Sequence, residues 1–223
     1  MKKLVIITVG KTHSGKTTFA HALEKHLGSS IIIDQDNHAG FLNTFYKKLL
    51  PVQGPNTLKT SLSKLIVDYA KEHTDFHFII SNSNRSSKGR KYLLEEVFPS
   101  EFFVRILVHF DISDDELHSR VKQSQRSTNI FRGSISNFEE LLFKQQAESL
   151  GEDIVDPTVH EADHLFIIKN KGDIDNVMGN IVQIAQTSLK NQARFLKKIS
   201  SISSTIRTHQ FQIFINFNQY SIR

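Results

Sequence analysis

A glycine-rich loop of eight residues near the N-terminus constrains the fold of this 223-residue chain more strongly than any other feature. The loop reads Gly10-Lys11-Thr12-His13-Ser14-Gly15-Lys16-Thr17, which fits the pattern G-x-x-x-x-G-K-[ST]. It follows the apolar run 4–9, and from Thr17 onward apolar residues recur at helical spacing. Between a strand and a helix, such a loop points backbone N–H groups at phosphate oxygens and adds the positive end of the helix dipole. The pattern therefore predicts a phosphate-binding loop in an α/β domain.

Strands and helices alternate along the first 186 residues. Short apolar runs predict five strands, at residues 4–9, 31–33, 76–80, 103–110 and 165–168. Helical spacing predicts helices at 17–28, 41–50, 57–71, 88–97, from 113, 137–150 and 174–186. In the helix 57–71, one face is expected to carry Leu58, Leu62, Leu65, Ile66 and Tyr69. This alternation predicts an α/β fold, a three-layer sandwich with a five-stranded parallel sheet and helices on both faces.

Acidic residues stop well before the end of the chain. The whole chain has 28 Lys and Arg against 23 Asp and Glu, a net charge of +5. The last acid is Asp175, and residues 187–223 hold six basic residues and no acid, so residues 1–186 carry a net charge of only −1. We predict a domain over residues 1–186 and a basic C-terminal tail over 187–223. In the tail, the alternating stretch 210–217 is either a strand or poorly ordered.

Composition excludes several classes of protein. With 39% hydrophobic and 23% charged residues, the chain is not wholly disordered, and without cysteine it has no disulfide, thiolate zinc site or cysteine nucleophile. No apolar run is long enough to span a membrane, and the N-terminal apolar run lacks a cleavage site, so we expect a cytoplasmic protein. Nucleic-acid binding by the tail is a less favoured alternative, because six cations over 37 residues are a modest density. The oligomeric state is not indicated.

Charged and polar residues cluster after the later predicted strands. Asp34 and Asp36 come directly after the second strand, and Ser81 ends the third. A carboxylate beside a phosphate loop can accept the proton of an attacking hydroxyl. Downstream, arginines are spaced through residues 114–146, where a mobile segment would let them neutralise charge on a transferring phosphoryl group. These arginines are Arg120, Arg126 and Arg132.

With these features, residues 4 to 186 resemble small P-loop kinases, in particular the ATP-binding domains of the polynucleotide-kinase-like and zeta-toxin-like group. The resemblance implies ATP and Mg²⁺ as cofactors and a helical lid within residues 114–146. It implies that Asp36 is the base, with Asp34 as second choice or as a helix cap, and that Lys16, Arg120 and Arg126 are catalytic, whereas Arg132 is either a lid residue or a loop cation. The residues expected to hold ATP are Gly10, Lys11, Thr12, His13, Ser14, Gly15, Lys16, Thr17 and Thr18, with Thr17 as the Mg²⁺ ligand.

The chain departs from this family at Ser81, which stands where the family has an acid. Just beyond it, Arg85 and Arg90 suit either an anionic substrate or a solvated helix face. The resemblance also places Asn170 and Lys171 beside the adenine ring.

We therefore predict an ATP-dependent kinase that transfers the γ-phosphoryl group to a hydroxyl of a small metabolite, nucleoside or nucleotide. The alternative is a nucleotide-binding switch or weak ATPase without phosphotransferase activity, which the missing acid at Ser81 favours.

Overall fold

A computed structural model describes residues 2–52, 54–133 and 135–188 of the chain. The chain divides into two compact units, Lys2–Val182 and a second unit that holds the residues from Gln183 onward. Of the second unit, residues 183–188 are helical, and residues 189–223 lie outside the described part. The domain boundary at 187 and the two alternatives for residues 210–217 therefore stay predictions.

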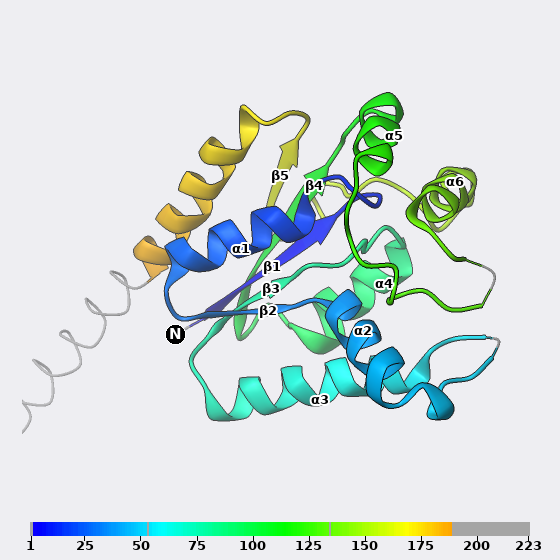
Figure 1. The fold of residues 1–223 in the computed structure, drawn as a ribbon. Coiled ribbons are helices and arrows are strands. Elements are labelled where there is room, and N and C mark those ends of the chain that lie inside the picture. The colour runs from blue at the N-terminus through cyan, green and yellow to red at the C-terminus, as the bar shows by residue number, and fades with distance from the viewer. Residues whose placement is uncertain (1, 53, 134, 189–223) are drawn as a thin grey trace, which may run out of the picture. The chain divides into compact units, whose positions relative to one another are not determined.

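The unit Lys2–Val182 is built on a single sheet of five parallel strands (Figure 1). Their order across the sheet is β2-β3-β1-β4-β5, so the first strand lies in the centre. The strands are β1 (Lys3–Val9), β2 (Ser30–Ile33), β3 (His77–Ile80), β4 (Phe103–Phe110) and β5 (His164–Ile168). The predicted five-stranded parallel sheet is confirmed.

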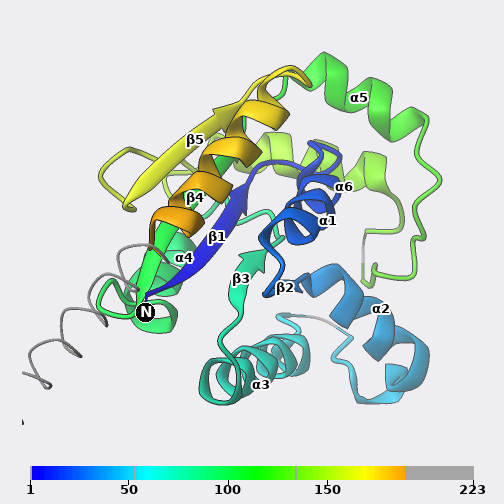
Figure 2. The same ribbon diagram turned by 90° about the vertical axis from the view of Figure 1, so that its left-hand side faces the viewer.

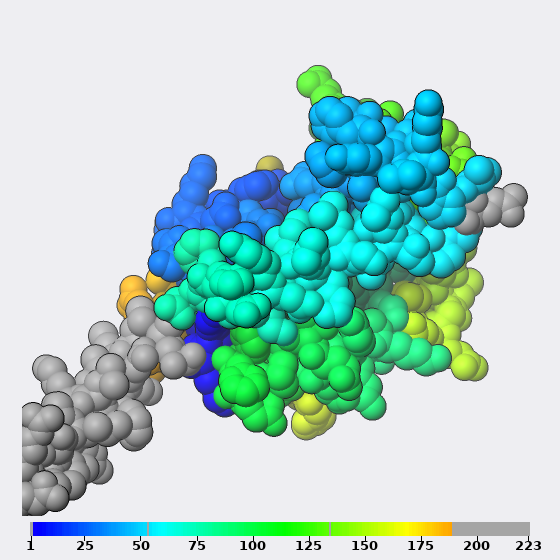
Figure 3. Space-filling view, turned by 90° about the horizontal axis from the view of Figure 1, so that it is seen from below, coloured from blue at the N-terminus to red at the C-terminus, as the bar shows by residue number. Residues whose placement is uncertain are grey.

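Helices cover both faces of this sheet, which confirms the three layers (Figures 1 and 2). α1 (Lys16–Leu27) and a helix that begins at residue 173 lie on one face, whereas α3 (Thr57–His73) and α4 (Ser87–Tyr92) lie on the other. In Figure 3, α3 and the neighbouring α2 form the surface on the lower side of the molecule. The remaining elements are α2 (Gln35–Phe45), the 3₁₀ turn η1 (Lys47–Leu49), the π-helical turn η2 (Leu93–Val97), α5 (Asp114–Lys122) and α6 (Phe138–Glu148). No described helix is both long enough and apolar enough to cross a bilayer.

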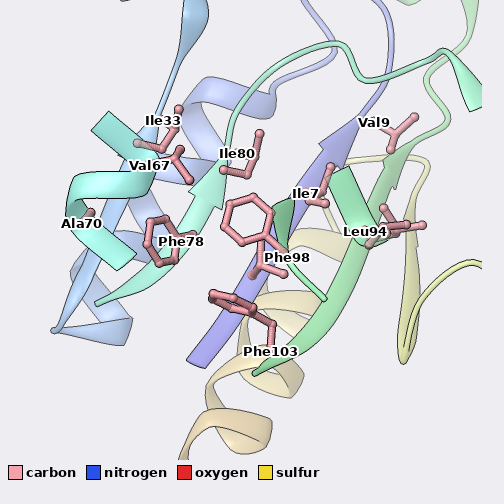
Figure 4. Close-up of a cluster of buried hydrophobic side chains, with 12 residues drawn as sticks. Ile7, Val9, Ile33, Val67, Ala70, Phe78, Ile80, Leu94, Phe98 and Phe103 are labelled. Carbon is pink, nitrogen blue, oxygen red and sulfur yellow. The ribbon is translucent and has the colours of Figure 1, made fainter. Parts of the chain in front are cut away.

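Aromatic rings dominate the core between the sheet and α3 (Figure 4). Phe98 packs against Phe78 and Phe103, with ring centroids 5.3 and 5.1 Å apart. Val67 and Ala70 of α3 close this cluster from the helical side. Each fully buried aromatic or aliphatic side chain contributes roughly 1.5–3 kcal/mol, so this cluster anchors α3 to the sheet.

Two predicted helices differ in their bounds. The helix predicted at 41–50 begins at Gln35, because Asp34 caps it by accepting a hydrogen bond from the N–H of Asp36 at 2.8 Å. It ends at Phe45 and is followed by the 3₁₀ turn. The helix predicted at 88–97 is α-helical only to Tyr92 and continues as the π-helical turn.

The predicted apolar face of α3 was wrong in part: Ile66 packs against the core cluster, and Leu58 and Leu62 are half-buried. Leu65 and Tyr69 are 66% and 63% exposed, and the buried face is formed by Ser63, Val67 and Ala70. Small and β-branched side chains allow the helix to approach the sheet closely, so the bulkier residues are left facing solvent. Apolar residues occur on more than one face of this helix, and spacing alone therefore did not identify the buried one.

Candidate functional site

The carboxyl ends of the parallel strands bring the candidate residues to one edge of the sheet. Ile80 of β3 is in register with Ile7 of β1 on one side and with Ile33 of β2 on the other. Asp34 and Ser81, the residues that follow β2 and β3, are therefore neighbours, beside the loop that follows β1. In open parallel sheets, ligands bind outside this edge, next to a central strand.

Backbone geometry explains both glycines of the loop. Gly10 has φ +151° and Gly15 has φ +104°, values that side chains rarely tolerate. A Cβ on Gly10 would lie 3.0 Å from atoms of Phe110 and from the Ser14 hydroxyl, so the loop starts packed against the end of β4. The glycines therefore allow the tight turn into α1.

The first turn of α1 is open to an anion. Its N-cap is Gly15, which provides no side-chain hydrogen bond, and the first turn contains no acid. By contrast, α2, α3, α4, α5 and α6 all have side-chain caps, from Asp34, Asn56, Ser86, Ser113 and Asn137. Uncapped N–H groups at the positive end of a helix favour a bound phosphate.

Lys16 curls back over the loop. Its Nζ donates to the carbonyl of Lys11 at 2.5 Å and to the Ser14 hydroxyl at 3.1 Å. Burial lowers its pKa to about 7; the charge of Asp36 opposes this shift and that of Arg126 adds to it. An anion in front of the loop would favour the charged ammonium.

Nucleotide binding should therefore take up a proton. Near pH 8 most Lys16 is neutral in the free protein, and the phosphates of ADP would restore its charge, so ADP affinity should fall as the pH rises above 7. Titration calorimetry at pH 8 in buffers of different ionisation enthalpy measures the uptake, which should approach one proton and vanish in Lys16→Met. Equal heats in all buffers for the native protein would contradict the proton uptake.

The lowered pKa of Lys16 also affects the stability of the free protein. Between pH 7 and 10.5 the unfolded chain binds more protons at Lys16 than the folded one, so the free energy of unfolding should rise with pH.

Thr17 lies between two oxygen-bearing side chains. Its hydroxyl donates to Asp34 at 3.3 Å, and the Ser81 hydroxyl is 3.5 Å away. Burial raises the pKa of Asp34 although hydrogen bonds from the Asp36 N–H and Thr17 favour the ionised form. Within the described residues no lysine or arginine pairs with Asp34. A cation at this point would offset the burial of the carboxylate. Mg²⁺ prefers such oxygen ligands and retains several waters, so these residues fit it.

Asp36 faces Arg126, which lies in the connection between α5 and α6. Its carboxylate accepts a hydrogen bond from Arg126 Nη2 at 3.1 Å, and the Arg126 guanidinium lies 4.8 Å from the centroid of the Phe138 ring. Arg120 instead reaches the phosphate loop, where its Nη1 donates to the carbonyls of His13 and Ser14 at 3.2 and 3.3 Å. Both arginines thus lie at the site, one at the carboxylate and one at the loop.

The connection that carries Arg126 is not helical. It leaves α5 after Lys122, passes close to α2 and enters α6 at Phe138 (Figure 1). Asn129 fastens it to α2, donating to the Gly40 carbonyl at 3.3 Å and to the Thr44 hydroxyl at 2.8 Å. The predicted lid therefore consists of two helices joined by an irregular segment. Phe138, predicted as core packing, is buried.

His13 in the phosphate loop contacts the same ring. Its imidazole meets Phe138 edge-on at 4.7 Å, and Nδ1 lies 3.0 Å from the Thr12 hydroxyl. Burial lowers its pKa to about 4, and the charges of Arg126, Lys16 and Arg120 act in the same direction. The imidazole is therefore neutral near pH 7, and its Nε2 is buried without a hydrogen-bond partner in the described structure.

A cavity of about 660 Å³ joins these groups. Of the predicted residues, those that line it are Thr12, His13, Gly15, Lys16, Thr17, Thr18, Asp36, Ser81, Arg120 and Arg126. Gly10, Lys11 and Ser14, which were also predicted to hold ATP, are not among the lining residues. The Lys11 side chain pairs with Asp114 at 2.6 Å. Asn170 and Lys171 are exposed and do not line the cavity, so their contact with adenine stays a prediction.

Six residues of the lining were not predicted as site residues, namely Gln35, Lys59, Asn82, Ser83, Leu141 and Gln145. Gln145 and Lys59 bear most on the chemistry. Gln145 of α6 accepts from the Thr12 N–H at 2.7 Å and so holds the phosphate loop. Lys59 of α3 also lines the cavity. Neither stands in a motif; the signal for Lys59 is its place four residues before Ser63, on the buried face of α3.

The sequence comparison assigns the chain to a family. Residues 5–152 match the AAA domain family AAA_33. The chain belongs to this AAA domain family. Among curated protein sequences, none is significantly similar to the chain.

Solved structures share the fold of this AAA domain at low identity. A candidate kinase from Chloroflexus aurantiacus is 17% identical with a TM-score of 0.53, over 84% of this chain and 98% of that one. The tunicamycin resistance protein of Deinococcus radiodurans is 16% identical with a TM-score of 0.50, over 82% and 95%. Shikimate kinase from Bacteroides thetaiotaomicron is 15% identical with a TM-score of 0.49, over 82% and 98%. The first two structures show that the α/β fold of this domain is shared with them, whereas the polynucleotide-kinase and zeta-toxin group stays a prediction.

Three other arginines of this AAA domain serve its structure. Arg90 is fully buried and paired with Glu161, so both alternatives predicted for it were wrong. Arg85 is 9% exposed and donates to the Gln145 carbonyl at 2.6 Å, which rules out a solvated helix face. Arg132 joins the α5–α6 connection to the segment before α3, by donating to the carbonyls of Pro51 and Gly54.

Proposed function

We propose that this protein is an ATP-dependent kinase that transfers the γ-phosphoryl group to a hydroxyl of a small metabolite, nucleoside or nucleotide. One observation carries the proposal: a carboxylate, Asp36, lines the same cavity as the phosphate-loop Lys16 and the arginines Arg120 and Arg126. A loop that only bound nucleotide would not need a carboxylate paired with a guanidinium in front of it.

Each side chain has a role in the transfer. Lys16 and the N–H groups at the start of α1 hold the β- and γ-phosphates. Thr17 and Asp34 would hold Mg²⁺, which would neutralise phosphate charge. Asp34 thereby provides the carboxylate that is missing at Ser81. Arg120 and Arg126 stabilise charge on the transferring group.

These positions account for each bond and for the proton of the transfer. The acceptor oxygen forms a bond to the γ-phosphorus while the bond to the oxygen bridging the β- and γ-phosphates breaks, and that electron pair stays on ADP. Asp36 accepts the proton of the acceptor hydroxyl and releases it to water when the site reopens. Catalysis is then mostly positioning and electrostatics.

Transfer of labelled γ-phosphate over a panel of hydroxyl compounds tests the proposal. Turnover should appear with at least one acceptor and fall by about a hundredfold or more in Lys16→Ala, because one charged donor to the transferring phosphate is removed. Lys25→Ala, in the last turn of α1, is the matched control and should leave the rate unchanged. If Lys16→Ala leaves every turnover unaffected, the proposal is wrong.

A second candidate is a nucleotide-binding switch or weak ATPase, which Ser81 favours. It predicts phosphate release that no acceptor accelerates. Comparing ATP hydrolysis with and without each acceptor distinguishes the two functions.

A further inference from the structure

Lys59 is a lysine on the buried face of a helix. It precedes Ser63 by four residues and Val67 by eight, and both of these are buried. Ser63 contacts α2 through its hydroxyl, 2.7 Å from Nδ1 of His38. The face of α3 that carries Lys59 is therefore the face turned toward α2, whose first residues include Asp36.

The charge of Lys59 has no fixed partner. Burial lowers its pKa; the charge of Asp36 opposes that shift and that of Arg132 adds to it. Asp36 itself is paired with Arg126, and in the described part of the chain no salt bridge involves Lys59. A half-buried ammonium without a partner is unfavourable, so the binding of an anion beside Lys59 would lower the electrostatic free energy of the site.

In the proposed function the nucleotide phosphates are held by Lys16, the start of α1 and the two arginines. Lys59 lines the same cavity from α3, as does Asp36 from the first turn of α2. The charge of Asp36 acts on both lysines and raises the pKa of each. A second molecule in this cavity could therefore place a hydroxyl at Asp36 and an anionic group at Lys59.

We propose that Lys59 is the acceptor-specificity residue and that the acceptor carries an anionic group, a carboxylate or a phosphate monoester, that pairs with the Lys59 ammonium while a hydroxyl of the same molecule faces Asp36. This inference rests on the proposed kinase function. It narrows the acceptors to hydroxy acids and phosphorylated alcohols, sugars or nucleosides. Neutral polyols and free nucleosides are disfavoured, because they would leave the ammonium unpaired.

Matched acceptors test the inference by turnover. The two compounds of each pair differ only in the anionic group. A hydroxy acid is compared with its amide, and a sugar or nucleoside is compared with its monophosphate. The first pair tests recognition of a carboxylate and the second tests recognition of a phosphate. Lys59→Met should raise the acceptor KM of the anionic member about tenfold to a hundredfold, the size of a lost charged hydrogen bond. The KM for ATP and the rate with the neutral member should change less than about twofold, and Lys59→Arg should restore most of the loss.

Lys64→Met is the matched control, because it removes the same charge from the exposed side of the same helix, where Lys64 pairs only with Asp68. It should behave as the native protein. If Lys59→Met changes the KM of both members alike, or if the neutral members are the better substrates, the inference is wrong while the kinase function stands.

A second arm requires no turnover. The protein is saturated with Mg²⁺ and a non-hydrolysable ATP analogue, which fills the phosphate loop, and its thermal stability is followed against inorganic phosphate and against acetate at constant ionic strength. One of the two anions should stabilise the native protein and Lys64→Met but not Lys59→Met. If this holds without any phosphoryl transfer, the kinase function fails and the anion site survives; equal stabilisation of all three proteins overturns the anion site.

Discussion

Replacing Asp36 by asparagine should lower kcat for phosphoryl transfer about a thousandfold. The amide has the size of the carboxylate but cannot take the acceptor proton, and a positioned general base contributes about 10²–10⁴. It also removes the ionic partner of Arg126, which lies 3.1 Å away. The affinity for nucleotide should remain within a few-fold, because Lys16 and the start of α1 are untouched. Single-turnover measurement of transfer, with ADP binding by calorimetry, separates the two effects.

Two variants make this test specific. Asp68→Asn removes an exposed carboxylate of α3 and should leave kcat unchanged. Asp34→Asn changes the residue that caps α2 and contacts Thr17, so it should weaken the Mg²⁺ dependence of nucleotide binding, which Asp36→Asn should not. A kcat for Asp36→Asn within about threefold of the native value would show that Asp36 is not the base, and a large loss confined to Asp34→Asn would transfer the role to its neighbour.

The central part of the site was predictable because its determinants are local in sequence. Gly10, Gly15, Lys16 and Thr17 form one short motif between a strand and a helix, and chain connectivity alone places them together. Strand-ending Asp34 was predictable for a related reason, because parallel strands all end at the same edge of the sheet. The apolar runs predicted every strand. The three central strands are buried on both faces and so are mostly apolar, and the edge strands β2 and β5 have short apolar runs although they are only partly buried.

The rest depends on contacts between distant segments. Lys59 joins the cavity only because α3 packs against the sheet through Ser63, Val67 and Ala70, a face that the apolar spacing did not reveal. Arg126 meets Asp36 only because the α5–α6 connection is fastened to α2, 90 residues away in the sequence. From the sequence, Arg90 looks like an ordinary cation of a helix, because only the fold brings Glu161 beside it.

Removing the Arg90 side chain should destabilise the protein by about 3–5 kcal/mol, the usual loss when one partner of a buried ion pair is removed. Arg90 is fully buried and holds Glu161 with two hydrogen bonds, Nε to Oε2 at 2.7 Å and Nη2 to Oε1 at 3.0 Å. Its Nη1 also donates to the Arg85 carbonyl at 2.8 Å, and so fixes the loop between β3 and α4. That loop accepts a hydrogen bond from the Gly10 N–H through the Ser83 carbonyl, so the buried pair also supports the base of the phosphate loop.

Guanidinium unfolding of Arg90→Leu measures the loss as a lower midpoint at an unchanged slope. Lys64→Met, which breaks an exposed pair within α3, should leave the unfolding midpoint nearly unchanged. Adding Glu161→Met to Arg90→Leu should recover about 2 kcal/mol, because the second change removes the carboxylate left without its partner.

The same ion pair makes the stability depend on pH. Burial raises the pKa of Glu161, but the hydrogen bonds from Arg90 and the Thr158 N–H outweigh it and hold the pKa below its usual value. The native protein should therefore lose the stability of this pair as the pH falls through that lowered pKa. Arg90→Leu should lack that acid-dependent step. A loss below about 1 kcal/mol, or no recovery in the double variant, would show that Arg90 packs as an aliphatic stem and that its charge adds nothing to the fold.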